Sequence, residues 1–243
     1  MGVVPWAAEF TAYSPSHLVV LGLFAVGTVV LLAVGPRWRG SPAEQPVGLG
    51  LAWGNLVFGV LSSISALMPF TVRHSLPLQI CDLGWIVVAW ALFTRHPMAS
   101  ALTYYWGLTL SVQALLQPTL TTPYPHLEFF AFWGKHLLIV WGAMYFSLVL
   151  RNGADWAAYR RAVGWTLVWL VVVLCLNAAL GSDYGYVNGK PSEATVLDVL
   201  GPWPLYLLAE MAIIMTGWAL ITIPWTGLPR RQARVSGSRR PLS

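Results

Sequence analysis

The sequence has very little charge. Only 9% of its 243 residues are charged and 57% are hydrophobic, whereas an ordinary soluble domain carries about 25% charged residues. A soluble core of this size would still need a charged outer surface, so lipid must cover much of the exterior. The sequence therefore predicts an integral membrane protein.

Cysteine is also scarce. Cys81 and Cys175 are the two cysteines, and both lie in apolar segments, which excludes a disulfide framework and a paired metal-ligand spacing. His17, His74 and His126 fall near predicted helix ends without a short spacing such as His-x-x-x-His. No metal site and no cofactor are predicted.

Basic residues form no surface interleaved with aromatic residues, so the net charge of +5 predicts no nucleic-acid partner. Residues 1–16 contain no Lys or Arg, unlike the basic start of a cleavable signal peptide. We therefore expect the first apolar run to be retained in the mature protein.

Long apolar runs dominate the rest of the chain. Each approaches the roughly 20 residues that an α-helix needs to cross a bilayer of about 30 Å, and prolines cluster near the ends of the runs. The pattern predicts an all-α, polytopic transmembrane bundle of about seven helices in a single domain, residues 1–227. The runs lie near 17–34, 50–68, 77–95, 98–117, 127–149, 160–180 and 203–224.

The loops between these runs differ in charge. One set holds only Arg73 and Lys190, whereas the other set and the tail hold most of the basic residues, which predicts that the amino terminus lies outside and the carboxyl terminus is cytoplasmic. Residues 228–243 are rich in Arg, Ser and Gly and are expected to form a disordered tail that rests on anionic lipid. The expected location is the cell membrane, with several spans. The basic loop residues predicted to be cytoplasmic are Arg37, Arg39, Arg95, Arg151, Arg160 and Arg161.

Polar residues within the runs gather in the predicted outer half of the helices. A charged residue near the bilayer centre costs roughly 2.5–3.5 kcal/mol on insertion scales, so we expect a polar cavity open to the outside and bounded by the third, fifth and seventh helices. The residues in question are Gln79, Cys81, Asp82, Gln113, Gln117, Glu128, Lys135, His136, Asn177 and Glu210.

Cys81 and His136 are the pair with reactive chemistry. A thiol needs a nearby base to supply its thiolate, and an imidazole serves this purpose. Helical rise places the two residues at similar depths on different helices. The alternative is that Cys81 is a small packing residue and His136 only hydrogen-bonds a neighbour.

The carboxylates allow two interpretations. Asp82 is turned about 100° around the helix from Cys81, so we expect it to orient a residue of a neighbouring helix, either Lys135 or His136. The interpretation favoured here is an ion pair of Asp82 or Glu210 with Lys135 that neutralises charge inside the bundle.

The loop 182–202 is long and predicted to be outside. Asp183, Tyr184, Tyr186 and Asp198 within it either cover the cavity or solvate the connection and cap the next helix.

Four stretches resemble the YwaF-like family of bacterial integral membrane proteins, which is related to eukaryotic transmembrane cysteine-dependent phospholipid acyltransferases. The resemblance implies that Cys81 and His136 match the family's acyl-transfer centre. Asp183 and Lys135 depart from the residues that are familiar at those positions, which are Asn and a small or neutral residue. The stretches are Leu-Pro-Leu-Gln-Ile-Cys-Asp-Leu at 76–83, Pro-His to Gly-Lys-His at 125–136, Gly-Ser-Asp-Tyr-Gly-Tyr to Gly-Lys-Pro at 181–191 and Leu-Asp-Val-Leu-Gly-Pro-Trp-Pro-Leu-Tyr at 197–206.

The leading hypothesis is a lipid acyltransferase or lipid esterase of the outer leaflet. Cys81 attacks an ester of a membrane phospholipid, His136 carries the proton, and a lysophospholipid or water accepts the acyl group. The alternatives are a small-solute transporter or ligand-binding membrane protein, for which no internal repeat is visible, and a non-catalytic membrane scaffold. The expected supporting residues of the polar cavity are Gln79, Asp82, Lys135, Asn177, Tyr184, Asp198 and Glu210, with Gln79 or Asn177 as donor to the developing oxyanion.

Overall fold

The computed structural model describes residues 9–152, 154–190 and 196–226, and the predicted tail, 228–243, lies outside them. All of the regular secondary structure in the described part is helical. The α-helices are α1 (Pro15–Trp38), α2 (Glu44–Ala66), α3 (Ile80–Thr94), α4 (Pro97–Tyr105), α5 (Ser111–Leu116), α6 (Leu127–Leu148), α7 (Trp156–Leu180) and α8 (Leu205–Thr222).

A π-helical segment, Trp106–Leu110, joins α4 to α5 without a break. The eight α-helices of the described part therefore form seven rods, which confirms the predicted all-α bundle of about seven helices. Five of the rods, those of α1, α2, α6, α7 and α8, are long and apolar enough to cross a membrane, and α3 is shorter at 15 residues.

Several helix ends differ from the prediction. α2 begins at Glu44 rather than near residue 50, and α7 begins at Trp156 rather than near residue 160. α3 begins at Ile80 rather than near residue 77, because the backbone N–H of Leu76 and the carbonyl of Leu78 bond the side chains of Tyr184 and Trp169 instead of extending the helix. α1 continues through Pro36 to Trp38. Pro36 lacks the N–H that would bond the Leu32 carbonyl, and the helix ends two residues later.

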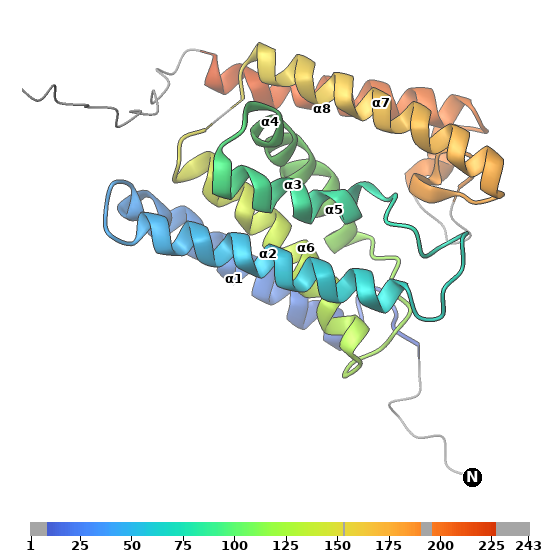
Figure 1. Cartoon of the computed structure of the whole chain (residues 1–243), viewed down its shortest axis with the longest axis horizontal. Coiled ribbons are helices and arrows are strands. Elements are labelled where there is room, and N and C mark those ends of the chain that lie inside the picture. The colour runs from blue at the N-terminus through green and yellow to red at the C-terminus, as the bar shows by residue number, and fades with distance from the viewer. Residues whose placement is uncertain (1–8, 153, 191–195, 227–243) are drawn as a thin grey trace, which may run out of the picture.

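α6 is the central helix of the bundle. Figure 1 shows α1 and α2 along one side of the molecule, α7 and α8 along the opposite side, and the remaining helices between them. α6 is 72% buried along its apolar window, compared with 17–22% for α1, α2, α7 and α8. Side chains from α6 are thus the best shielded from lipid.

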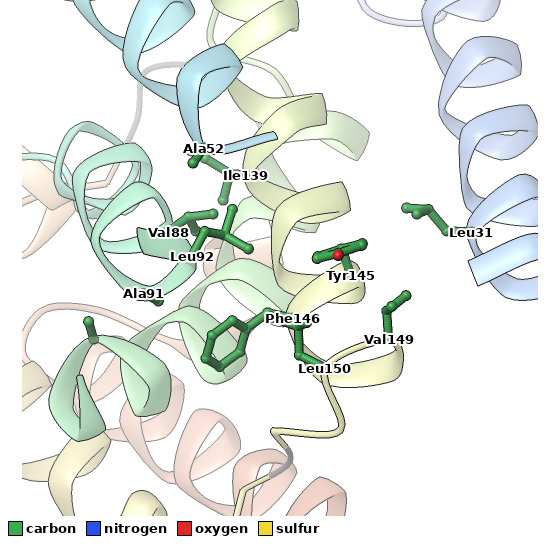
Figure 2. Close-up of a cluster of buried hydrophobic side chains, with 11 residues drawn as sticks. Leu31, Ala52, Val88, Ala91, Leu92, Ile139, Tyr145, Phe146, Val149 and Leu150 are labelled. Atoms are coloured by element: carbon green, nitrogen blue, oxygen red, sulfur yellow. The ribbon is translucent and has the colours of Figure 1, made fainter. Parts of the chain in front are cut away.

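The largest apolar cluster joins α6 to α1, α2 and α3 (Figure 2). Ile139 of α6 lies beside Ala52 of α2, while Tyr145 and Val149 face Leu31 of α1. A separate cluster around Tyr105, Trp106 and Trp218 joins α4 to α7 and α8. The two halves of the bundle are therefore connected through α3 and α4.

Helices α2 and α3 approach closely at Gly59, and replacing this glycine tests the packing. A Cβ at Gly59 would lie 2.1 Å from the Trp85 ring, whereas a Cβ at Gly50 of the same helix meets nothing within 4 Å. We expect Gly59→Ala to lower the free energy of unfolding by about 1–3 kcal/mol through overpacking. Gly50→Ala is expected to be neutral or slightly stabilising, since alanine favours helix. Thermal unfolding of the two variants in detergent measures the difference, and equal midpoints would contradict the packing.

Candidate functional site

A cavity of about 370 Å³ lies among α2, α3, α5, α6, α7 and α8, within the roughly 300–1,000 Å³ typical of small-molecule sites. It lies toward the end of the bundle where α3, α6 and α8 begin and where α5 and α7 end. Nine of the ten polar residues singled out in the sequence line it, which brings together side chains from four helices, α3, α5, α6 and α8. These nine are Gln79, Cys81, Asp82, Gln113, Gln117, Glu128, Lys135, His136 and Glu210.

Cys81 and His136 line this same cavity. Cys81 is the second residue of α3 and is half-buried, while His136 lies on the central helix α6 with 2% of its surface exposed. The thiol and the imidazole therefore line one cavity.

The tautomer of His136 follows from its hydrogen bond. Nδ1 lies 2.8 Å from the carbonyl oxygen of Phe132, one turn earlier on α6, and a carbonyl can only accept. Nδ1 of the neutral ring therefore carries the hydrogen and donates it, which leaves the lone pair on Nε2. The ring also packs against the Phe132 ring, with centroids 4.3 Å apart. Both contacts hold His136 in an orientation in which Nε2 is the atom able to accept a proton.

An ion pair links the two helices that supply Cys81 and His136. Lys135 Nζ donates to Asp82 Oδ1 at 2.9 Å, and the two side chains are 6% and 24% exposed. Of the partners predicted for Asp82, the structure selects Lys135. Each member is the sequence neighbour of a reactive residue, so the pair fixes α3 against α6 at the level of Cys81 and His136.

The chain that leads into α3 is held by the loop after α7. Tyr184 Oη accepts from the Leu76 N–H at 2.9 Å and donates to the Val72 carbonyl at 2.7 Å. Gln79 Oε1 accepts from the Gly185 N–H at 2.9 Å. Because Cys81 follows two residues after Gln79, this loop sets the position of the thiol.

Three of the predicted supporting residues lie outside the cavity wall. Asn177 is buried and bonds the loop: its Oδ1 accepts from the Ser182 hydroxyl and the Tyr184 N–H, and its amide donates to the Tyr184 carbonyl and Asn188 Oδ1, all at 2.9 Å. Tyr184 is 2% exposed and occupied by the contacts to the chain before α3. Asp198 pairs with Lys190 at 3.6 Å on the surface. These residues hold the loop after α7, in which Gly185, Tyr186 and Val187 line the cavity.

Asp183 occupies the centre of the same loop. Its Oδ1 accepts from the N–H groups of Asn188 and Gly189 at 2.9 and 3.1 Å. Burial raises the pKa of the Asp183 carboxyl above its ordinary value, and the two N–H groups act in the opposite direction. The loop is thus closed around a carboxyl group rather than the expected asparagine.

Some cavity residues were not predicted. Ser62 and Ser65 come from the last turns of α2, and Phe132 and Trp169 also line the wall. Tyr186, one of the loop residues named as a possible cover of the cavity, lines it as well. Two serines near the end of the second apolar run could have indicated that this helix borders the polar cavity. The indication is weak because a serine in a helix often bonds its own backbone, as Ser65 does with the Leu61 carbonyl at 3.0 Å. Within the described ranges, no group of three or more His, Cys, Asp or Glu residues is placed to hold a metal ion.

The model of the TMEM164 family matches residues 12–222. The chain belongs to the TMEM164 family. The match runs from before α1 to the end of α8 and includes every residue that lines the cavity. No curated protein and no solved structure matches the chain. As a member of this transmembrane family with five candidate spans, the TMEM164-family protein described here is a helical membrane protein.

Proposed function

We propose that the protein is a membrane lipid acyltransferase or lipid esterase with Cys81 as nucleophile and His136 as base. The observation that carries the proposal is the shared cavity, into which α3 contributes the thiol and α6 contributes an imidazole with Nε2 unprotonated. The resemblance of the stretches around Cys81 and His136 to cysteine-dependent phospholipid acyltransferases supports the same assignment. The loop charges predict that the site serves the outer leaflet of the cell membrane.

The reaction begins with transfer of the Cys81 thiol proton to His136 Nε2. The thiolate attacks the ester carbonyl carbon of a phospholipid, the carbon–oxygen bond breaks, and His136 returns the proton to the departing alcohol. The thioester on Cys81 is then attacked by a lysophospholipid hydroxyl or by water, whose proton passes to His136. Release of the acyl product returns this proton to the Cys81 sulfur.

Gln79 is the better of the two predicted oxyanion donors. Gln79 lines the cavity, and its Oε1 accepts from the Gly185 N–H, so the acceptor of its amide is occupied and the two N–H donors can serve a bound ester. Asn177 uses both of its donors within the loop. A fixed donor near the nucleophile can stabilise the negative oxygen of the tetrahedral intermediate.

The test compares acyl turnover by the purified parent, Cys81→Ala and His136→Ala in vesicles that contain labelled phospholipid and lysophospholipid. Cys81→Ala is expected to abolish turnover, and His136→Ala to reduce it by about 100- to 10,000-fold, as for loss of a general base. A labelled thioester on Cys81 of the parent is expected in the mass spectrum.

Cys175→Ala is the matched control, because Cys175 is the other cysteine and is exposed on α7. It is expected to keep parental turnover. Equal turnover in all four proteins would exclude the Cys and His mechanism. Lipid binding without turnover in any of them would favour the ligand-binding alternative.

A further inference from the structure

The cavity has two different walls. The side chains of α3 and α6, which include Cys81 and His136, are polar and reactive, whereas the wall of α7 and α8 is formed largely by Leu170, Leu207 and Met211 together with Ile214. A phospholipid ester has the same division, with a polar carbonyl and an apolar chain.

Along α8, the cavity residues beyond Glu210 are apolar. Leu207, Glu210, Met211 and Ile214 all face the cavity, at the i, i+3, i+4 and i+7 spacing of one helix face. Glu210 is the last polar residue of this face to line the cavity. Met211 and Ile214 follow, about 9 and 14 Å along α8 from its first residue at 1.5 Å per residue.

A second helix shows the same change. From the end of α5 toward the middle of the bundle, the cavity residues are Gln117, then Ala114 and Gln113, and then Leu110. Leu110 is the last residue of the π-helical segment, and such segments often occur at functional sites. On both helices the deepest cavity residues, Met211 and Ile214 on α8 and Leu110 next to α5, are therefore apolar.

The apolar compartment, lined by Met211, Ile214 and Leu110, is closed at its deep end by hydrogen bonds between side chains. Thr166 accepts from Trp106 Nε1 at 2.9 Å and donates to the Ala162 carbonyl at 2.8 Å. One turn beyond Ile214, Trp218 donates to Thr109 Oγ1 at 2.9 Å. These contacts satisfy the polar groups and leave Leu110 and Ile214 as the apolar floor.

We propose that this compartment holds the acyl chain of the lipid substrate, and that Ile214 and Leu110 set the longest chain accepted. The inference rests on the proposed function for its reactive end. An acyl chain of a membrane lipid is the fitting occupant, because the compartment is apolar, lies within a transmembrane bundle and opens toward the thiol that attacks the ester. Ile214 and Leu110 are specificity-determining residues in this proposal.

The test changes the depth of the compartment and keeps the reactive residues. Ile214→Phe shortens it, so the longest chains that the parent uses are expected to lose turnover by about 10- to 200-fold for each methylene that no longer fits, while short chains stay within about twofold, far below that effect. Ile214→Ala lengthens it and is expected to shift the preference toward longer chains. Ile213→Phe is the matched control, because Ile213 is the adjacent residue and is 58% exposed; it is expected to keep the parental chain preference.

A binding experiment separates this inference from the proposed function. In the Cys81→Ala background, lysophospholipids of one head group and increasing chain length compete with a labelled phospholipid, so no turnover is required. A shift of the preferred length with Ile214→Phe and Ile214→Ala, but no turnover in the parent, would retain the chain site and reject the enzyme. If the parent shows turnover but Ile214→Phe and Ile214→Ala keep the parental chain preference, the proposed acyl-chain site is wrong while the proposed enzymatic function stands.

Discussion

Replacing Asp82 with leucine is expected to lower the free energy of unfolding by about 3–5 kcal/mol, because Lys135 would keep a buried charge without its partner. Lys135 lies on α6, where its side chain is 6% exposed, so loss of the carboxylate leaves an ammonium group with little solvation. Thermal or denaturant unfolding in detergent measures the loss.

The double variant with Asp82→Leu and Lys135→Met shows whether the loss of stability comes from the unpaired charge of Lys135 or from the altered packing. Replacing both members of a buried ion pair with apolar residues of similar volume is often neutral or stabilising, so we expect the double variant to recover most of the stability. Arg95→Gln is the control, since its pair with Glu44 spans 3.9 Å and the Arg95 side chain is 51% exposed. Its expected cost is below about 1 kcal/mol. A double variant as unstable as Asp82→Leu would contradict the role of the unpaired charge.

Asn177→Ala is expected to loosen the loop after α7 and to lower the free energy of unfolding by at least about 2 kcal/mol. The variant leaves the buried N–H and carbonyl of Tyr184 without their partners, and each unsatisfied buried group costs about 1–3 kcal/mol. Because Tyr184 holds the chain around Val72 and Leu76, the effect is expected to reach the segment before Cys81. Hydrogen exchange of residues 72–79 and 182–189 measures it, together with the unfolding midpoint.

Asn152→Ala is the matched control for this loss, since Asn152 makes one side-chain bond to Ser100 at 3.3 Å. It is expected to change the unfolding midpoint little and to leave exchange in both segments unchanged. Fast exchange confined to 182–189 would show that the loop does not hold the segment before Cys81.

The helices could be predicted from the sequence because lipid imposes a length and a composition on each membrane-spanning segment. Interruptions are harder to predict. The run near 98–117 contains the π-helical segment Trp106–Leu110. Its Gly107 does not distinguish it from ordinary helix, since α1 and α2 also contain glycines. The late start of α3 depends on bonds from Tyr184 and Trp169, which lie about a hundred residues away in the chain.

The sequence predicted which residues lie at the depth of the site, but not which of them contact one another. Helical rise gives the depth of Cys81, Asp82, Lys135 and His136, but not the direction in which each side chain faces. The choice between Asp82 and Glu210 as the partner of Lys135 therefore needed the structure, which pairs Lys135 with Asp82. Asn177 has the right depth for the cavity, yet its four loop bonds turn it away.

The bonds that close the floor of the cavity also bear on the membrane as an insulator. A polar channel through all seven helices would let protons and ions leak and would dissipate the electrochemical gradient. Trp106 with Thr166, Trp218 with Thr109, and Tyr105 with Thr222 instead fill the bundle below Ile214 with bulky, mutually bonded side chains. The packed side chains below Ile214 thus separate the cavity from the opposite end of the bundle, so a cavity open at one end need not conduct ions.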